Sequence, residues 1–203
     1  MNISNNHIIN HYNTEAKCYS EKRNNGILSI FVRKEKTIVI DLLNINNEEK
    51  ILDAGCGDAD YSISINNAGG IPYGVDISSA MIDKYLSLGF DGKVDDIQTM
   101  KLNNHFDKIL CAGSLEFVLS PTKTINNLCS HLIKKGIIVW LYPRKSMGGI
   151  LYKMYHLIFN KINIHLFSKS NIIDIASYNG LVIIEQKKPD FITGAVKMVN
   201  KLI

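Results

Sequence analysis

The strongest constraint on the fold is an apolar run that ends in closely spaced glycines, the segment Ile51-Leu-Asp-Ala-Gly-Cys-Gly-Asp-Ala59. Glycine lets the chain turn sharply and lets a ligand approach the backbone closely. The helix that follows such a loop presents free N–H groups at its first turn. The segment therefore predicts a strand, a tight loop and a helix that bind a ligand. The competing interpretation is an ordinary turn in which glycine only supplies a positive φ.

Apolar strand patterns alternate with helical patterns along most of the chain. This alternation is typical of a parallel sheet with helices on both faces, and a parallel sheet has apolar strands because both its sides are buried. The last two strands are separated only by a short turn, so we expect them to pair as an antiparallel hairpin. We expect helices at 27–43, 61–67, 79–88, 121–133 and 169–178, and strands at 50–53, 72–76, 93–95, 106–111, 137–142, 181–187 and 192–199.

Local signals set several of these boundaries. Ser78 or Ser79 can cap the helix that follows, Pro121 suits a first helical turn, and Gly136 is expected to end a helix before the next strand. The pattern predicts an α/β fold with a Rossmann-like, seven-stranded, mostly parallel sheet, a terminal antiparallel hairpin and helices on both faces. We expect a single domain over residues 1–203.

Acidic residues follow two further strands, at the edge where parallel sheets bind ligands. Asp76 ends the second expected strand and can accept hydrogen bonds from the two hydroxyls of an adenosine ribose. After the third strand, Asp95 or Asp96 can accept from an adenine amino group, and we favour Asp96. Ile77 and Ile97 can sandwich the ring. Solvated acids in surface turns are the competing interpretation.

Composition and charge exclude several classes of protein. The chain is 46% hydrophobic and 21% charged, which is typical of a globular domain. Its net charge of +4 comes from scattered basic residues, so we expect no nucleic-acid partner. The four cysteines form no CxxC pair and predict no metal. The polar N-terminus is no signal peptide and the apolar runs are too short to span a bilayer, which predicts a cytoplasmic protein without stable membrane association.

Three motifs in this order resemble those of class I S-adenosylmethionine-dependent methyltransferases that act on small molecules. Residues 51–59 resemble motif I, 74–82 the segment after motif I, and 106–118 motif IV. The resemblance covers about residues 50–180. It implies S-adenosyl-L-methionine as cofactor and methyl transfer to an O or N atom of a small molecule in a biosynthetic pathway. At Ala59 the family has a third glycine, so we expect reduced clearance there.

The resemblance also implies roles for individual residues. The two loop glycines would lie against the methionine part, and Asp53 would serve its ammonium through water. Asp58 and Asp60 add negative charge beside the loop, which suits a cofactor with cationic groups. The backbone at Cys111 and Ala112 would face the amino-acid end. The implied cofactor-binding residues are Tyr19, Asp53, Gly55, Gly57, Asp76, Ile77, Met81, Asp96, Ile97 and Cys111.

The N-terminal stretch that contains Tyr12, Ala16, Tyr19 and Arg23 resembles the Tyr-x-x-x-Ala-x-x-Tyr lead-in of the same families, which folds over the cofactor. Tyr19 could touch the methionine end and Arg23 its carboxylate. We expect residues 1–45 to form a helical cap. A helix that uses its tyrosines only for packing is equally compatible with the pattern.

A long connection at 143–168 is expected to cover the acceptor pocket as a lid, because long insertions in compact domains are often functional. It contains Gly148 and Gly149 as a possible hinge and a very apolar helix at 150–159. Two alternatives are a helix that only packs on the core and a surface helix that touches a membrane. The few lysines of this helix argue against strong binding to anionic lipid.

An O or N acceptor must lose a proton, which calls for a base near neutral pKa. His156 and His165 are candidates, as are Glu116 and Tyr142, which follow strands at the ligand-binding edge. Each of these also has a purely structural interpretation. We expect a small-molecule acceptor and a monomer or homodimer.

Two other functions stay open. An NAD(P)-dependent oxidoreductase shares the glycine loop and the ribose acid, but Asp60 stands where the dinucleotide pattern has Gly or Ala. The other is a catalytically silent module that binds S-adenosylmethionine.

Overall fold

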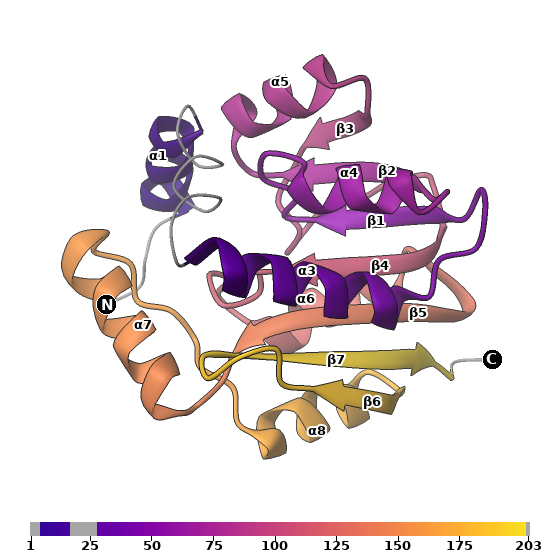
Figure 1. Ribbon diagram of the computed structural model, residues 1–203. Helices are drawn as coiled ribbons and strands as arrows, with labels where there is room; N and C mark the ends of the chain where they lie inside the picture. Colours follow the sequence, from indigo (N-terminus) through magenta and orange to yellow (C-terminus); the bar gives the residue numbers. More distant parts are fainter. Residues whose placement is uncertain (1–4, 17–27, 202–203) are drawn as a thin grey trace.

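The computed structural model describes residues 5–16 and 28–201. In these residues one seven-stranded sheet has the order β3-β2-β1-β4-β5-β7-β6 (Figure 1). β7 is antiparallel to its neighbours β5 and β6, and the other pairs are parallel, which confirms the predicted fold class. The strands are β1 (Lys50–Ala54), β2 (Ile71–Asp76), β3 (Asp91–Val94), β4 (Phe106–Ala112), β5 (Leu132–Pro143), β6 (Leu181–Lys187) and β7 (Thr193–Asn200).

Helices cover both faces of the sheet. Successive residues of a strand point to opposite faces, so apolar strands make both faces apolar and both must be buried. Ile51 packs with α3 and α4 in one buried cluster. Leu52, the next residue, packs in a second cluster with α6 and α8 around Trp140. No helix in the described ranges is long and apolar enough to cross a membrane. The helices are α1 (Asn5–Glu15), α3 (Leu28–Leu43), α4 (Asp60–Asn67), α5 (Ser79–Ser87), α6 (Pro121–Cys129), α7 (Met147–Phe159) and α8 (Lys169–Tyr178).

Most expected boundaries are confirmed to within two residues, and α8 and β6 have the predicted limits. Ser78 caps α5, since its hydroxyl accepts a hydrogen bond from the Met81 N–H. The boundary between α6 and β5 was predicted wrongly. α6 ends at Cys129 and β5 already begins at Leu132, so Gly136 lies inside the strand. Leu132 pairs with Phe106 and Ile137 pairs with Lys108, so the register shifts between these pairs and the extra residues lie in β5.

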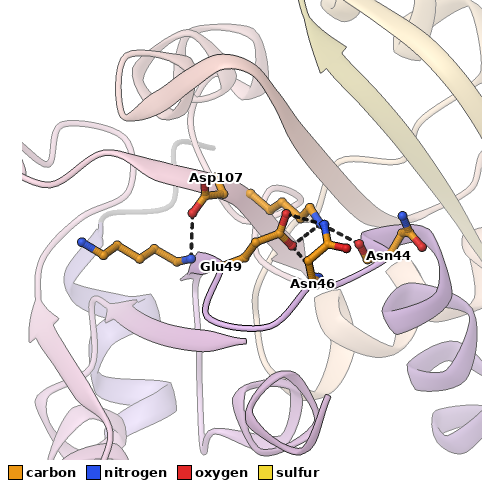
Figure 2. Close-up of polar contacts among 6 residues, drawn as sticks. Asn44, Asn46, Glu49 and Asp107 are labelled. Atoms are coloured by element: carbon orange, nitrogen blue, oxygen red, sulfur yellow. Dashed lines mark hydrogen bonds and ion pairs between the residues drawn. The ribbon is translucent and has the colours of Figure 1, made fainter. Parts of the chain in front are cut away.

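A polar network holds the amino ends of β1 and β4 (Figure 2). The buried Lys108 ammonium pairs with the Glu49 carboxylate and donates to the Asn44 carbonyl at 2.6 Å. The Lys50 N–H donates to the Asp107 carboxylate at 2.8 Å. The network ties the loop between α3 and β1 to β4, at the end of the strands remote from their ligand-binding carboxyl ends.

Candidate functional site

A cleft lies at the carboxyl ends of the central strands, and α1 contributes to its lining. Figure 1 shows how these strands and α1 are arranged. The walls of the cleft come from the loop after β1, the segments after β2 and β3, the loop after β4, and α1. This is the edge at which open parallel sheets bind ligands. The structure brings seven of the predicted cofactor-binding residues together there: Gly55, Gly57, Asp76, Ile77, Met81, Asp96 and Ile97.

The glycine loop forms the floor of the cleft. Gly55 has φ +84°, and a Cβ on it would lie 2.4 Å from the Ser114 Cβ. Gly57 also has a positive φ, of 51°. Ala59 adopts φ 70° where the family has glycine, and it immediately precedes α4. The loop therefore needs its glycines for backbone conformation and for close packing against the loop after β4.

Asp76 is fixed by the backbone around it. One carboxylate oxygen accepts from the Gly57 N–H and the other from the Ser78 N–H, both at 2.9 Å. Burial raises the pKa of this carboxyl, and the backbone hydrogen bonds from Ser78 and Gly57 oppose that rise. Each oxygen keeps a further lone pair, so the carboxylate is held in place as an acceptor at the cleft.

Asp96, of the two acids after β3, is the one that lines the cleft. Both its oxygens accept from the side-chain amide of Gln98, at 3.1 and 3.0 Å. Asp95 instead pairs with Lys93 at 2.8 Å. The Gln98 amide thus holds Asp96 beside Ile97, although nothing in the sequence singled out Gln98.

Asp53 and Cys111 do not reach the cleft wall. The Asp53 side chain is buried beneath the glycine loop and accepts a 2.7 Å hydrogen bond from the Ser62 hydroxyl. That hydroxyl also bonds the Tyr85 hydroxyl at 2.7 Å. Cys111 is fully buried in β4, whereas Ala112, the second residue of the predicted backbone pair, lines the cleft.

Helix α1 supplies two lining residues that the site prediction missed, Ile8 and Tyr12. The Tyr12 ring meets the Phe117 ring edge to face, with centroids 5.7 Å apart. Asn13 ties α1 to the start of α5, because its side-chain oxygen accepts from the Ser78 hydroxyl at 2.6 Å. Tyr12 of the lead-in motif was the sequence signal that could have placed α1 at the cleft. Tyr19 and Arg23 lie outside the described residues.

The rim of the cleft carries two more acids, Asp58 and Asp60. Asp60 pairs with Lys36 of α3 at 2.5 Å, and Asp58 lies 3.6 Å from Lys84 of α5. None of the lining residues that the structure describes is Lys, Arg or His. The cleft therefore presents negative charge, which disfavours a pyrophosphate and suits a cationic ligand.

The four candidate bases do not line the cleft, although three stand directly behind residues that do. Glu116 is buried, with its Oε1 3.8 Å from the position a Cβ on Gly113 would take. A His165 ring nitrogen lies 3.0 Å from the Val118 carbonyl oxygen, and His165 itself is exposed. Tyr142 is packed in the core against Phe167.

His156 of α7 is buried, and its ring meets the Phe117 ring at 5.6 Å between centroids. Burial lowers its pKa to about 4, and the charge of His11 acts in the same direction. The imidazole is therefore neutral near pH 7 and a weak proton acceptor in this conformation. The rings of Tyr12, Phe117 and His156 form a continuous contact from α1 to α7 across one side of the cleft.

No cluster of three or more His, Cys, Asp or Glu side chains in the described part of the chain is placed to hold a metal ion. Three of the four cysteines, Cys56, Cys111 and Cys129, are buried free thiols, and Cys18 lies among the residues not described.

Comparisons with known proteins agree with this geometry. A model of the methyltransferase domain family matches residues 31–186. The ubiquinone biosynthesis O-methyltransferase of Coxiella burnetii is 36% identical over 93 residues, which are 42% of this chain and 39% of that protein. The match thus spans about two fifths of that relative's length.

Two solved structures share the fold at low sequence identity. The magnesium protoporphyrin IX methyltransferase of Synechocystis PCC 6803 with bound SAH has a TM-score of 0.78 and 17% identity, over 97% of this chain and 100% of that one. The N-methyltransferase NodS of Bradyrhizobium japonicum, in complex with S-adenosyl-L-homocysteine, has a TM-score of 0.67 and 16% identity, over 84% and 87%. Because the family model spans most of the chain, the protein belongs to the methyltransferase domain family, as the resemblance to class I S-adenosylmethionine-dependent methyltransferases predicts.

Proposed function

We propose that this chain binds S-adenosyl-L-methionine in the cleft and transfers its methyl group to an O or N atom of a small molecule. The observation that carries the proposal is Asp76. Its two oxygens are held by backbone N–H groups beside a glycine loop that leaves the backbone open to a ligand. When bound, the cofactor supplies an electrophilic methyl group on a positively charged sulfur.

The lining residues fit this cofactor better than a dinucleotide. Its sulfonium and ammonium groups are positive, and the described walls carry four aspartates and no basic side chain. The diphosphate of NAD would meet a lining with four aspartates, and the two lysines nearby, Lys36 and Lys84, already pair with Asp60 and Asp58. We assign the ribose hydroxyls to Asp76, the adenine amino group to Asp96, and the faces of the adenine ring to Ile77 and Ile97.

The acceptor is proposed to lie against the apolar side of the cleft. Ile8, Tyr12, Phe117 and Val118 meet there, so the wall suits a molecule with an apolar or aromatic part. Residues 143–168 are proposed to cover this side as a lid, and residues 1–45 to cap the cofactor. The match to an O-methyltransferase and to an N-methyltransferase fold supports either acceptor atom.

Proton removal from the acceptor is proposed to involve a group behind this wall. Glu116 backs Gly113, and His156 backs Phe117. A rearrangement of α7 that exposes His156 to water would raise its pKa toward the ordinary value and make it a better base. His165, which lies behind Val118, is a third candidate, and Tyr142 is the candidate that contacts no lining residue described above.

Calorimetry tests the cofactor site. S-adenosyl-L-homocysteine is expected to bind the parent protein and NADH is not. Asp76→Ala removes the half-buried carboxylate assigned to the ribose hydroxyls and should weaken binding by roughly 1.5–3 kcal/mol, about tenfold or more. Asp83→Ala, an exposed aspartate on α5, is the matched control and should bind as the parent does. Failure of well-folded parent protein to bind would refute the cofactor assignment.

Methyl transfer itself is measured with radiolabelled S-adenosyl-L-methionine and a panel of apolar phenols and amines. Transfer that the Asp76→Ala variant loses in parallel with binding supports the enzyme. Binding without transfer across the whole panel would favour the silent binding module.

A further inference from the structure

Helix α7 exposes an unusually apolar surface. Leu151, Ile158 and Phe159 are 62%, 61% and 71% exposed. Eight of its thirteen side chains are exposed and large and apolar: Met147, Ile150, Leu151, Met154, Tyr155, Leu157, Ile158 and Phe159. Isolated exposed apolar residues are normal, whereas a continuous patch of this kind marks an interaction site.

The buried side of α7 is a narrow stripe. Its fully buried residues are Gly148, Gly149 and His156. A Cβ on Gly149 would lie 1.8 Å from the Arg144 carbonyl oxygen, and one on Gly148 would meet Phe191. The glycines therefore allow close packing in the first turn of α7. After that turn, the only buried side chain of the helix is His156, and most of the others are exposed to solvent. Figure 1 shows α7 at the margin of the molecule, next to α1.

Positive charge accompanies this helix. Residues 144–161, which comprise α7 and its flanks, contain four of the 23 Lys and Arg residues and none of the 19 acidic residues. Lys145 precedes α7, Lys153 lies within it, and Lys161 follows it. An apolar helical surface flanked by lysines matches an anionic lipid surface, where the apolar side chains enter the acyl boundary and the lysines meet the headgroups.

We propose that α7 is an interfacial helix that docks the protein reversibly on an anionic lipid bilayer. Thirteen residues span about 20 Å as a helix, too short to cross a hydrocarbon core of about 30 Å, so α7 lies in the interface. The short apolar runs predicted no stable membrane association, and the few lysines of this helix argued against strong binding to anionic lipid; the eight exposed apolar side chains of α7 are what the structure adds. Reversible docking through exposed apolar side chains is compatible with that expectation.

The same charge argues against a second copy of this chain as the occupant. A symmetric pairing of α7 with itself would bring Lys145, Lys153 and Lys161 of both copies together, and like charges oppose such a contact. A lipid surface of opposite charge has no such penalty. Docking would also place the bilayer beside the proposed acceptor wall, because His156 contacts Phe117. That last point rests on the proposed function, whereas the docking does not.

The test is co-sedimentation of the full chain with vesicles of phosphatidylcholine, with and without about one third phosphatidylglycerol. We expect at least tenfold stronger binding to the anionic vesicles, and weaker binding as salt is raised. The variant Leu151→Ser/Ile158→Ser/Phe159→Ser should lose vesicle binding. The matched control Leu86→Ser/Tyr178→Ser/Ile184→Ser changes three exposed apolar residues on α5, α8 and β6 and should keep it. Lys145→Gln/Lys153→Gln should lose the preference for anionic vesicles.

Light scattering and calorimetry with S-adenosyl-L-homocysteine accompany the vesicle assay for every variant. The α7 variant should bind S-adenosyl-L-homocysteine as the parent does, which separates docking from the cofactor site and shows that the variant is folded. Equal sedimentation of parent and α7 variant would overturn the proposal. So would parent dimers that α7 substitution dissociates without any vesicle binding, because the surface would then be an interface between copies.

Discussion

Asp53 is a buried carboxyl whose surroundings oppose its charge. Burial raises its pKa to about 7, against the effect of the Ser62 hydrogen bond, and the nearby charges of Asp76, Asp60 and Asp58 add to the rise. The unfolded value is near 3.9. The folded protein therefore binds more protons than the unfolded chain between about pH 4 and 7, so this residue lowers stability as pH rises through that window.

Asp53→Asn removes this titration while its amide oxygen can still accept from the Ser62 hydroxyl. The free energy of unfolding of the variant, relative to the parent, should rise by about 2–3 kcal/mol between about pH 5 and about pH 8. Urea unfolding at both values measures it, with the exposed Asp174→Asn as control. A difference between variant and parent that does not change with pH would contradict the assigned pKa. The same variant should weaken S-adenosyl-L-homocysteine binding if Asp53 serves the cofactor ammonium.

Lys108 presents the opposite case, a buried cation matched by an anion. Burial alone would raise the pKa of Glu49, but the hydrogen bonds from Lys108 and Asn46 outweigh it and lower the pKa. The pair therefore contributes stability above the unfolded Glu49 pKa and loses it as pH falls through the lowered folded value.

Lys108→Met should destabilise the fold by about 3 kcal/mol at neutral pH, because it leaves the Glu49 carboxylate and the Asn44 carbonyl without their partner. The loss should shrink in acid, where Glu49 is protonated. Chemical denaturation across the acid range measures both effects. Lys134→Met, at an exposed position of β5, should stay within about 0.5 kcal/mol of the parent, and an equal loss in both variants would refute the role of the network.

At the scale of elements, the attachment of α1 rests on few groups. The Asn13 side-chain oxygen accepts from the Ser78 hydroxyl and, at 3.4 Å, from the Ala80 N–H. Asn13→Ala should weaken S-adenosyl-L-homocysteine binding several-fold, because α1 then spends less time beside the cleft, and should change the unfolding free energy by no more than about 1 kcal/mol. Asn6→Ala, exposed on the same helix, is the control. Unchanged binding by Asn13→Ala would show that α1 is no cap.

Elements defined by local signals were predictable from the sequence, and those set by long-range pairing were not. The cap of α5 and the limits of α8 depend on residues next to them in the chain. At the start of β5, Leu132 continues the helical spacing of Ile125 and Leu128, so the sequence favours a longer α6. The pairing with Phe106 that makes it a strand exists only once β4 lies alongside.

The site divides in the same way. Motifs in the sequence identified the glycine loop, the acids at the strand ends and the apolar residues next to them. Seven of these residues line the cleft. Ile8, Tyr12 and Gln98 reach it through tertiary packing, which no local pattern specifies. The candidate bases were chosen for their chemistry, which does not fix where they lie. Glu116 and His156 are buried behind the cleft wall because elements distant in the sequence enclose them.

At the scale of the whole molecule, charge and burial are unevenly distributed. The cleft side concentrates acids around the glycine loop, whereas the segment 117–173 is free of acids. The central strands β1, β4 and β5 hold fully buried side chains, whereas α1 and α7 bury few of their described side chains. Elements with little buried surface open most easily, so α1 and α7 are the parts in which a ligand can change the dynamics most.

Amide hydrogen exchange with and without saturating S-adenosyl-L-homocysteine tests this distribution. Ligand at 100 times its Kd adds about 2.7 kcal/mol of global stability, which should raise the Tm by roughly 5–10 °C for a domain of this size. Beyond that uniform gain, exchange should slow selectively in α1 and in residues 53–59, which lie at the cleft. It should slow little in α7, because the proposed lid covers the acceptor, which is absent from this experiment. Slower exchange in 53–59 with α1 unchanged would remove residues 1–45 from the cofactor site. Slower exchange in α7 with the cofactor product alone would mean that the lid closes on the cofactor and does not depend on the acceptor.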